Sequence, residues 1–240
     1  MIQVFVKEFN SFLNSLIAYI VIGAFLTGIG LLTWVFPETS VLDYGFADLD
    51  TLFSMAPYVF IFLIPAITMK SFAEEKKMGT LELLLTKPLS DWNVVVGKFF
   101  ATCALVFLAL VPTVIYYFSV YKLGNPVGNV DSAGVMGSYI GLALLAMIFS
   151  AFGLFASSLT SNQIVSFILA AFLCFLIYMG FDSLSAFGGN AALFIKQFGI
   201  IYHYESLSKG LVDSRDVIYF LSVTVFILLT TKVVISSRQW

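Results

Sequence analysis

Charged residues are absent from four long stretches of this chain, residues 10–37, 51–69, 99–121 and 132–181. A helix needs about 20 predominantly apolar residues to cross the hydrocarbon core of a bilayer. Only 11% of the 240 residues are charged, against roughly 25% in ordinary soluble domains. The sequence therefore predicts an all-α integral membrane protein.

The fourth uncharged stretch is too long for a single span. As one helix it would extend over about 75 Å, whereas the hydrocarbon core is about 30 Å thick. Its one sustained polar cluster, SSLTSNQ at residues 157–163, is the natural place for a turn. We therefore predict six transmembrane helices, near residues 12–36, 52–70, 93–121, 135–157, 163–181 and 216–236.

The distribution of lysine and arginine predicts that both termini are cytoplasmic, because these residues favour the cytoplasmic side of a membrane. With an even number of spans the termini share one side. That side would hold Lys7, Lys70, Lys76, Lys77, Lys87, Lys98, Lys232 and Arg238. The opposite side would hold half as many bases, namely Lys122, Lys196, Lys209 and Arg215.

Before the first span, apolar residues recur at steps of three and four, which places them on one helical face: Ile2, Phe5, Phe9, Phe12, Leu13 and Leu16. This stripe predicts a helix lying in the membrane interface over residues 1–11. The alternative is that residues 1–11 are only the first turns of span one.

A charged segment with a leucine ridge, residues 71–92, is expected on the cytoplasmic side between spans two and three. Ser71 and Glu74 have the spacing of a capping box, and Asp91 is placed to cap the third span. Gly79 disfavours a continuous helix, so we predict a break at Gly79 and Thr80, with Thr80 capping a second short helix that ends before Pro88. The pattern favours docking on a partner, while packing on the membrane surface and an unspecialised loop stay open.

The segment between the last two spans, residues 182–215, is expected outside and is too apolar for a free loop. Gly188 and Gly189 form a hinge between two apolar halves. One interpretation is a pair of short helices dipping into the outer leaflet, and the other is a cap packed on the spans. The sequence leaves both open.

The residue inventory excludes several classes of active site. The single histidine, His203, cannot build a multi-histidine zinc site, and no GxSxG motif occurs, so a structural or interfacial role is predicted for it. Gly97 and Lys98 lack the other residues of an ATP-binding P-loop. Asp182 stands at a span end, and the spans show no buried charge, which argues against an intramembrane protease or a proton pump. We predict a subunit without catalytic or metal site.

The stretch EEKKMGTLELLLTKP, residues 74–88, resembles the E-x-x-x-G-T-x-E-x-L-L signature that follows the second span of ABC-2 type transporter permeases. The matching residues are Glu75, Gly79, Thr80, Glu82, Leu84 and Leu85. Further stretches, among them LGNPVGNVDSAGVMGSYIG and HYESLSKGLVDSRDVIYFLS, are similar to the GldF-like permease subunits associated with gliding motility. The resemblance extends over nearly the whole chain.

The resemblance implies one six-span permease domain over residues 1–240, of the ABC-2 or type V exporter kind. Its region 71–92 would form a coupling helix that seats in a separate cytoplasmic ABC ATPase. The implied ATPase-coupling residues are Glu74, Glu75, Lys76, Lys77, Met78, Gly79, Thr80, Leu81, Glu82 and Leu85. ATP would be bound by the partner, so no cofactor is expected in this chain.

The resemblance further implies a second membrane subunit and the inner membrane of a Bacteroidetes-type bacterium. The expected partners are thus the ATPase, that subunit and lipid, and a net charge of −2 provides no basic surface for nucleic acid. Two other functions stay open. The complex could transmit force to the outside without moving a solute, or the chain could be a scaffold for motility and secretion proteins.

Overall fold

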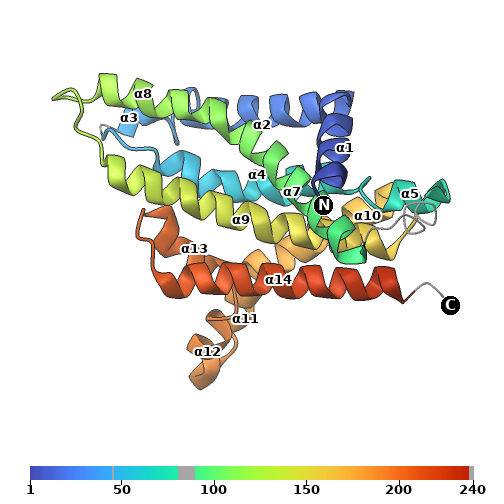
Figure 1. The fold of residues 1–240 in the computed structure, drawn as a ribbon. Helices are drawn as coiled ribbons and strands as arrows, with labels where there is room; N and C mark the ends of the chain where they lie inside the picture. Colours follow the sequence, from blue (N-terminus) through green and yellow to red (C-terminus); the bar gives the residue numbers. More distant parts are fainter. Residues whose placement is uncertain (45, 81–89, 238–240) are drawn as a thin grey trace.

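The computed structural model describes residues 1–44, 46–80 and 90–237, and all of the regular secondary structure in these residues is helical (Figure 1). The elements are α1 (Ile2–Leu13), α2 (Leu16–Trp34), α3 (Val41–Tyr44), α4 (Asp50–Thr68), α5 (Ala73–Lys77), α7 (Asp91–Leu110), η1 (Val111–Thr113), α8 (Val114–Leu123), α9 (Ser132–Leu159), α10 (Gln163–Phe175), the π-helical turn η2 (Leu176–Gly180), α11 (Phe181–Ser185), η3 (Gly189–Ala191), α12 (Ala192–Lys196), α13 (Ile200–Ser208) and α14 (Ser214–Ser236).

Within the described residues, six helical segments are long and apolar enough to cross a membrane: Leu16–Trp34, Asp50–Lys77, Asp91–Leu123, Ser132–Leu159, Gln163–Ser185 and Ser214–Ser236. The prediction of an all-helical protein with six spans is confirmed. In Figure 1, α1, α5 and the end of α14 lie at the same end of the bundle. We call this the α5 end, and the opposite end, which carries the start of α9 and of α14, the outer end.

The predicted turn inside the longest uncharged stretch is also confirmed. α9 ends at Leu159 and α10 begins at Gln163. The side-chain Oδ1 of Asn162 accepts from the N–H groups of Ile164 at 2.9 Å and Val165 at 3.5 Å. Asparagine is a preferred residue at this position because its side chain fills donors that a helix leaves unpaired at its start.

α9 is the central helix of the bundle, because α4, α7, α10, α13 and α14 all pack against it. Small residues permit these close contacts. A Cβ atom added to Gly153 would overlap Thr68 of α4, and one added to Gly141 would lie 2.7 Å from Cβ of Leu207 on α13. In membrane proteins, such small residues let helices approach closely and gain dispersion contacts.

α1 runs across the α5 end of the bundle at a steep angle to α2 (Figure 1). It packs on α7, with Val4 buried and the rings of Phe5 and Phe9 stacked at 5.8 Å between centroids. The break between α1 and α2 at residues 14–15 rules out one continuous first span. An interfacial position for α1 stays a prediction, supported by this angle.

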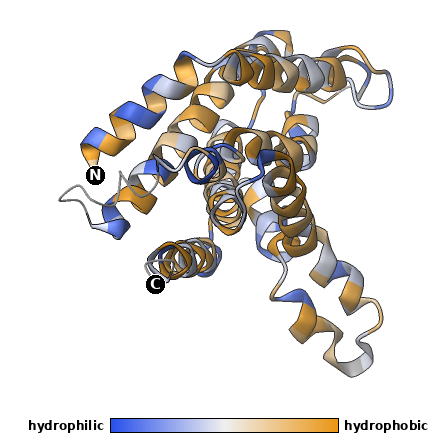
Figure 2. Ribbon diagram, turned by 90° about the vertical axis from the view of Figure 1, so that its right-hand side faces the viewer, coloured by the Kyte–Doolittle hydropathy of each residue, from blue (hydrophilic) through white to orange (hydrophobic). Residues whose placement is uncertain are grey.

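The segment between the last two spans combines the two arrangements that the sequence left open. α11 and α12 form a hairpin that projects sideways from the bundle, as Figures 1 and 2 both show. α13 instead packs on α9, and the hydroxyl of its Tyr204 donates to the carbonyl oxygen of Phe53 on α4 at 2.7 Å. Burial raises the pKa of Tyr204 well above its usual value, which keeps this hydroxyl a neutral donor.

Candidate functional site

The predicted coupling residues belong to the connection between α4 and α7, at the α5 end of the bundle (Figure 1). We call residues 69–90 the α4–α7 segment. Its described part contains α5, which ends at Lys77. Gly79 follows with a backbone φ of +68°, in the left-handed region that favours glycine. The predicted break at Gly79 is confirmed, whereas the predicted residues Leu81, Glu82 and Leu85 lie outside the described residues.

Two predicted helix caps are wrong. Ser71 and Glu74 do not form a capping box, since the Oγ atom of Ser71 has no hydrogen-bond partner in the described part of the chain. The residue that caps α7 is Ser90, whose side chain accepts from the N–H of Asn93, and not Asp91. Asp91 instead accepts from the hydroxyl of Ser236 at 2.7 Å, which ties the start of α7 to the end of α14.

The cap that Ser71 was expected to supply comes from α9. The Oγ atom of Ser157 accepts from the backbone N–H groups of Phe72 and Ala73, both at 3.0 Å, and donates to the carbonyl oxygen of Met69. The ring of Phe72 is fully buried in an apolar cluster formed with residues of α7, α9 and α14. A neighbouring helix therefore replaces the local capping partner, and α5 starts in a fixed position against α9.

A buried ionic cluster lies next to this anchor. Lys98 of α7 is only 1% exposed, and its Nζ lies 3.0 Å from Oε1 of Glu8 on α1 and 3.0 Å from Oε1 of Glu75 on α5. The same nitrogen donates to the carbonyl oxygen of Ser71 at 2.7 Å. Since an ammonium group has three N–H donors, these three oxygen atoms match its full donor capacity. We call Lys98, Glu8 and Glu75 the buried ionic cluster.

An aromatic ring and a second basic side chain lie next to the buried ionic cluster. Lys98 lies over the ring of Phe72, with Nζ 5.1 Å from the ring centroid, an attractive cation–π arrangement. The half-exposed Lys7 adds a second positive charge, 3.5 Å from Oε1 of Glu75. Two bases thus face two carboxylates in a mostly dry site, where ion pairs are little screened by salt.

The cluster corrects one sequence-based expectation. The sequence indicated no buried charge in the spans, yet Lys98 lies inside the third span and is buried. Glu75, one of the predicted coupling residues, pairs with Lys98 inside the chain. The sequence shows that Lys98 and Glu75 are charged residues near the ends of neighbouring spans. It does not show that they pair, because the site forms where α1 crosses α7.

In its described part, the α4–α7 segment offers an outside partner an exposed tip, residues 77–79. Lys77, Met78 and Gly79 are exposed, and Met78 leaves 61% of its surface accessible. Lys76 points the other way, because its Nζ contacts the backbone carbonyl of Ser158 at the end of α9. The segment therefore combines an exposed tip with a base held by α1, α7 and α9.

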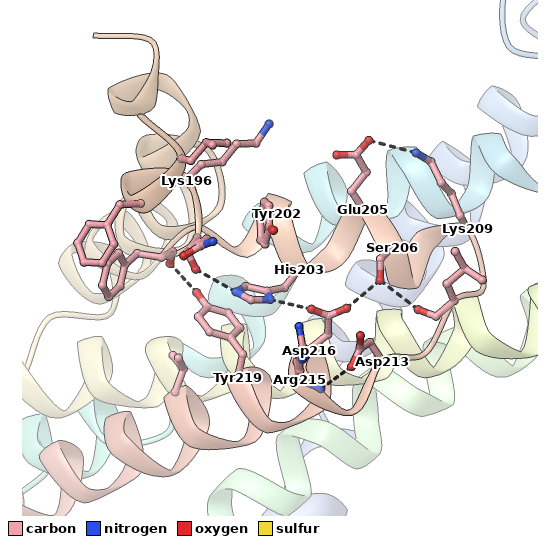
Figure 3. Close-up of a pocket in the computed structure, with 16 residues that line it drawn as sticks. Lys196, Tyr202, His203, Glu205, Ser206, Lys209, Asp213, Arg215, Asp216 and Tyr219 are labelled. Atoms are coloured by element: carbon pink, nitrogen blue, oxygen red, sulfur yellow. Dashed lines mark hydrogen bonds and ion pairs between the residues drawn. The ribbon is translucent and has the colours of Figure 1, made fainter. Parts of the chain in front are cut away.

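A second concave region lies at the outer end, between α12, α13 and the start of α14. It is a pocket of about 1050 Å³ whose lining includes His203, Ser206 and Asp216 (Figure 3). Ser206 donates to Oδ2 of Asp216 at 2.7 Å and not to the imidazole of His203. This geometry does not activate a serine nucleophile, because activation requires a base to take the hydroxyl proton. In the described part of the chain, no group of three or more potential ligands could hold a metal ion.

Comparison with known proteins agrees with this architecture. The profile of the ABC-2 family transporter proteins matches residues 39–237, which is most of the chain and includes five of the six spans. The chain belongs to the ABC-2 family. Among similar proteins are the probable multidrug ABC transporter permeases YbhR of Escherichia coli K12 and of Escherichia coli O157:H7, each 28% identical over 128 residues.

The similarity to the two YbhR proteins is partial. It covers 53% of this ABC-2 family member and 32% of each relative, so the matched region is about a third of their length. The family membership thus establishes the multi-pass membrane character of the chain. The α4–α7 segment of this ABC-2 protein lies within the residues that the family profile matches.

Proposed function

We propose that the chain is the permease subunit of an ABC transporter and that the α4–α7 segment couples it to a separate ATPase. The observation that carries the proposal is the construction of this segment. Its exposed tip ends in Gly79, while its base is tied to α1, α7 and α9 through Lys98 and Ser157. A force applied to the tip would therefore reach several spans at once, as coupling between two distant sites requires.

The proposal places ATP binding on the partner and both termini in the cytoplasm. The α5 end carries Lys7, Lys70, Lys76, Lys77, Lys98 and Lys232. The outer end carries Lys122, Lys209 and Arg215, and Lys196 ends α12 of the hairpin that projects sideways. This bias supports a cytoplasmic α5 end in a bacterial inner membrane. A second membrane subunit is part of the proposal because of the resemblance to GldF-like permease subunits, and the large apolar side chains that α2, α10 and α14 expose are available to lipid or to that subunit.

The association with gliding motility is the more specific part of the proposal. It rests on the similarity of the stretches around Gly79, Gly134 and His203 to GldF-like subunits. Deletion of the corresponding gene in a gliding bacterium is expected to abolish spreading on agar, and the unaltered gene to restore it. Normal spreading of the deletion strain would contradict the motility role and would leave the assignment as an ABC permease unaffected.

The coupling role is tested at the exposed tip, where a substitution leaves the buried ionic cluster intact. Met78→Glu combined with Lys77→Glu is expected to reduce co-purification of the ATPase at least about tenfold, because two new charges oppose an interface that buries an apolar side chain. The measurement is ATPase protein and ATP turnover in eluates from native membranes. Val127→Glu, at an exposed outer-end site, is the matched control and is expected to retain both.

Equal recovery of ATPase and turnover from the tip variant, the control and the unmodified chain would contradict coupling through this segment. Recovery of no ATPase from any of the three would favour a scaffold role. If ATPase binding holds, reconstitution into vesicles separates the remaining possibilities. Solute flux that depends on ATP indicates a transporter, whereas ATP-dependent rearrangement of the α11–α12 hairpin without flux indicates force transmission.

We also propose that the α11–α12 hairpin inserts into the outer leaflet. Large apolar side chains of the hairpin are exposed, among them Phe187 at 90% exposure, Leu193 and Phe194. A nitroxide label at Phe187→Cys is expected to collide more often with oxygen, which concentrates in the bilayer, than with a water-soluble nickel chelate. A label at Val127→Cys should show the reverse preference. The same preference at both sites would contradict insertion.

A further inference from the structure

His203 of α13 lies at a junction of three helices in the outer pocket (Figure 3). Its Nδ1 is 2.7 Å from Oδ1 of Asp216 near the start of α14, and its Nε2 is 2.9 Å from the carbonyl oxygen of Gln197, the residue that follows α12. The imidazole also stacks on the ring of Tyr219 of α14, with centroids 3.9 Å apart. A single side chain thus connects the base of the α11–α12 hairpin to α13 and α14.

The hydrogen-bond partners of the ring determine how many protons it carries. A carbonyl oxygen only accepts, and so does an ionised carboxylate. A neutral imidazole has one N–H group and can donate to only one of them, whereas the imidazolium form donates to both. Imidazole is a stronger base than a carboxylate in water, so a proton shared with Asp216 resides on His203. The observed geometry is therefore complete only when His203 is doubly protonated.

The two lysines that line the pocket form ion pairs with carboxylates other than Asp216. Lys196 of α12 pairs with Asp182 at 3.3 Å, and Lys209 of α13 pairs with Glu205 at 3.1 Å. The remaining charged lining residues are Asp213, which caps α14, and Arg215, with Tyr202 and Tyr219 contributing aromatic rings. Asp216 accepts a second bond, from Ser206, which holds its carboxylate in place for His203.

We propose that His203 is a pH-responsive tie that fastens the α11–α12 hairpin to α13 and α14. In the protonated state both bonds are present and the tie is closed. When the ring loses one proton, the remaining N–H stays with Asp216, because a charged acceptor forms the stronger bond. The lone pair of Nε2 then faces the carbonyl oxygen of Gln197. The hydrogen bond between these two atoms is lost, and their lone pairs repel each other. The base of the hairpin is therefore fastened at lower pH and released as pH rises.

The structure also supplies a bond that does not depend on this proton. The hydroxyl of Tyr219 donates to the carbonyl oxygen of Phe198 at 2.6 Å, directly beside the Gln197 contact. This bond limits the release, so the hairpin is expected to gain freedom rather than to detach. Both bonds are made by residues of the segment from Gln197 to Tyr219, so neither requires a residue of the α4–α7 segment.

The proton itself is observable because His203 is the only histidine in the chain. Protein labelled with ¹⁵N-histidine, in lipid nanodiscs, is expected to give two protonated-type ring nitrogen signals near about pH 5, and one such signal near about pH 8. Detection of one unprotonated ring nitrogen throughout this pH range would overturn the proposal. The measurement needs neither a transported solute nor an ATPase.

The hairpin position is followed by pulsed electron resonance between nitroxides at Leu193→Cys on α12 and Val233→Cys on α14, both exposed. Loss of one hydrogen bond is expected to raise the ratio of displaced to docked hairpin about fivefold between the acidic and the basic sample. His203→Phe preserves the stacked ring and should show the larger ratio at both pH values. Tyr219→Phe should raise the ratio at both values yet retain its response to pH.

Two outcomes would overturn the tie. One is a distance distribution of the otherwise unmodified chain that stays the same across the pH range. The other is a His203→Phe chain that still responds to pH as the unmodified chain does. If His203→Phe does not fold, the comparison of the unmodified chain with Tyr219→Phe still tests whether the pH response exists and whether it is separate from the Phe198 bond.

Discussion

Lys98→Met is expected to destabilise the protein by about 3–5 kcal/mol, because it removes the partner of two buried carboxylates. Glu8 and Glu75 both lie 3.0 Å from the Lys98 Nζ, and Lys98 is itself buried. Without the ammonium group, the exposed Lys7 is the one basic side chain of the described residues that is paired with the two carboxylates. The measurement is the free energy of unfolding in mixed detergent micelles.

A triple variant shows how much of the destabilisation by Lys98→Met comes from the unpaired carboxylates and how much comes from altered packing. Lys98→Met combined with Glu8→Gln and Glu75→Gln removes every charge of the buried ionic cluster, and it is expected to recover most of the stability. Replacing a buried ion pair with neutral residues of similar volume is often nearly neutral. A single Lys98→Met variant as stable as the unmodified chain would show that the cluster does not hold α1, α5 and α7 together.

Gly137→Ala is expected to destabilise the protein by about 1–3 kcal/mol through overpacking between α9 and the turn after α13. An added Cβ atom would lie 2.8 Å from the carbonyl carbon of Gly210 and would overlap its carbonyl oxygen. The obstacle is backbone and not a flexible side chain. Gly210 itself lies against the backbone of Gly134, so the turn and α9 meet backbone to backbone.

Gly23→Ala is the matched control, because a Cβ atom at this α2 position has no neighbour within 4 Å. It should leave the stability unchanged or raise it slightly, since alanine favours a helix over glycine. Thermal unfolding of both variants in the same detergent provides the comparison. Equal midpoints for the two variants would contradict the close approach of α9 and the turn at Gly210.

The broad fold follows from patterns that act over one segment at a time. Uncharged stretches of about 20 residues predict spans, because the energy of placing a helix in lipid depends mainly on its own side chains. The turn at residues 157–163 and the break at Gly79 are equally local, since Asn162 caps its own helix and Gly79 supplies its own left-handed conformation. These features could be predicted without knowing what lies beside them.

The contacts of the α4–α7 segment could not be predicted from the sequence. The motif around Gly79 marked the α4–α7 segment, and the structure shows Met78 at its exposed tip. Nothing local indicates that Glu75 turns inward to Lys98, a residue of another helix. The failed capping box has the same cause, because Ser157 from α9 takes the place of Ser71 as the acceptor for the first-turn N–H groups of α5.

The amino-acid sequence by itself determined the six apolar helices, their boundaries within a few residues and the family signature at residues 75–85. Only the tertiary structure decided which charges pair: Glu8 with Lys98 across 90 residues, Glu75 with the same lysine, and His203 with Asp216. The physical reason is that insertion into lipid sums over the residues of one helix, whereas an ion pair depends on the distance between helices that only packing sets.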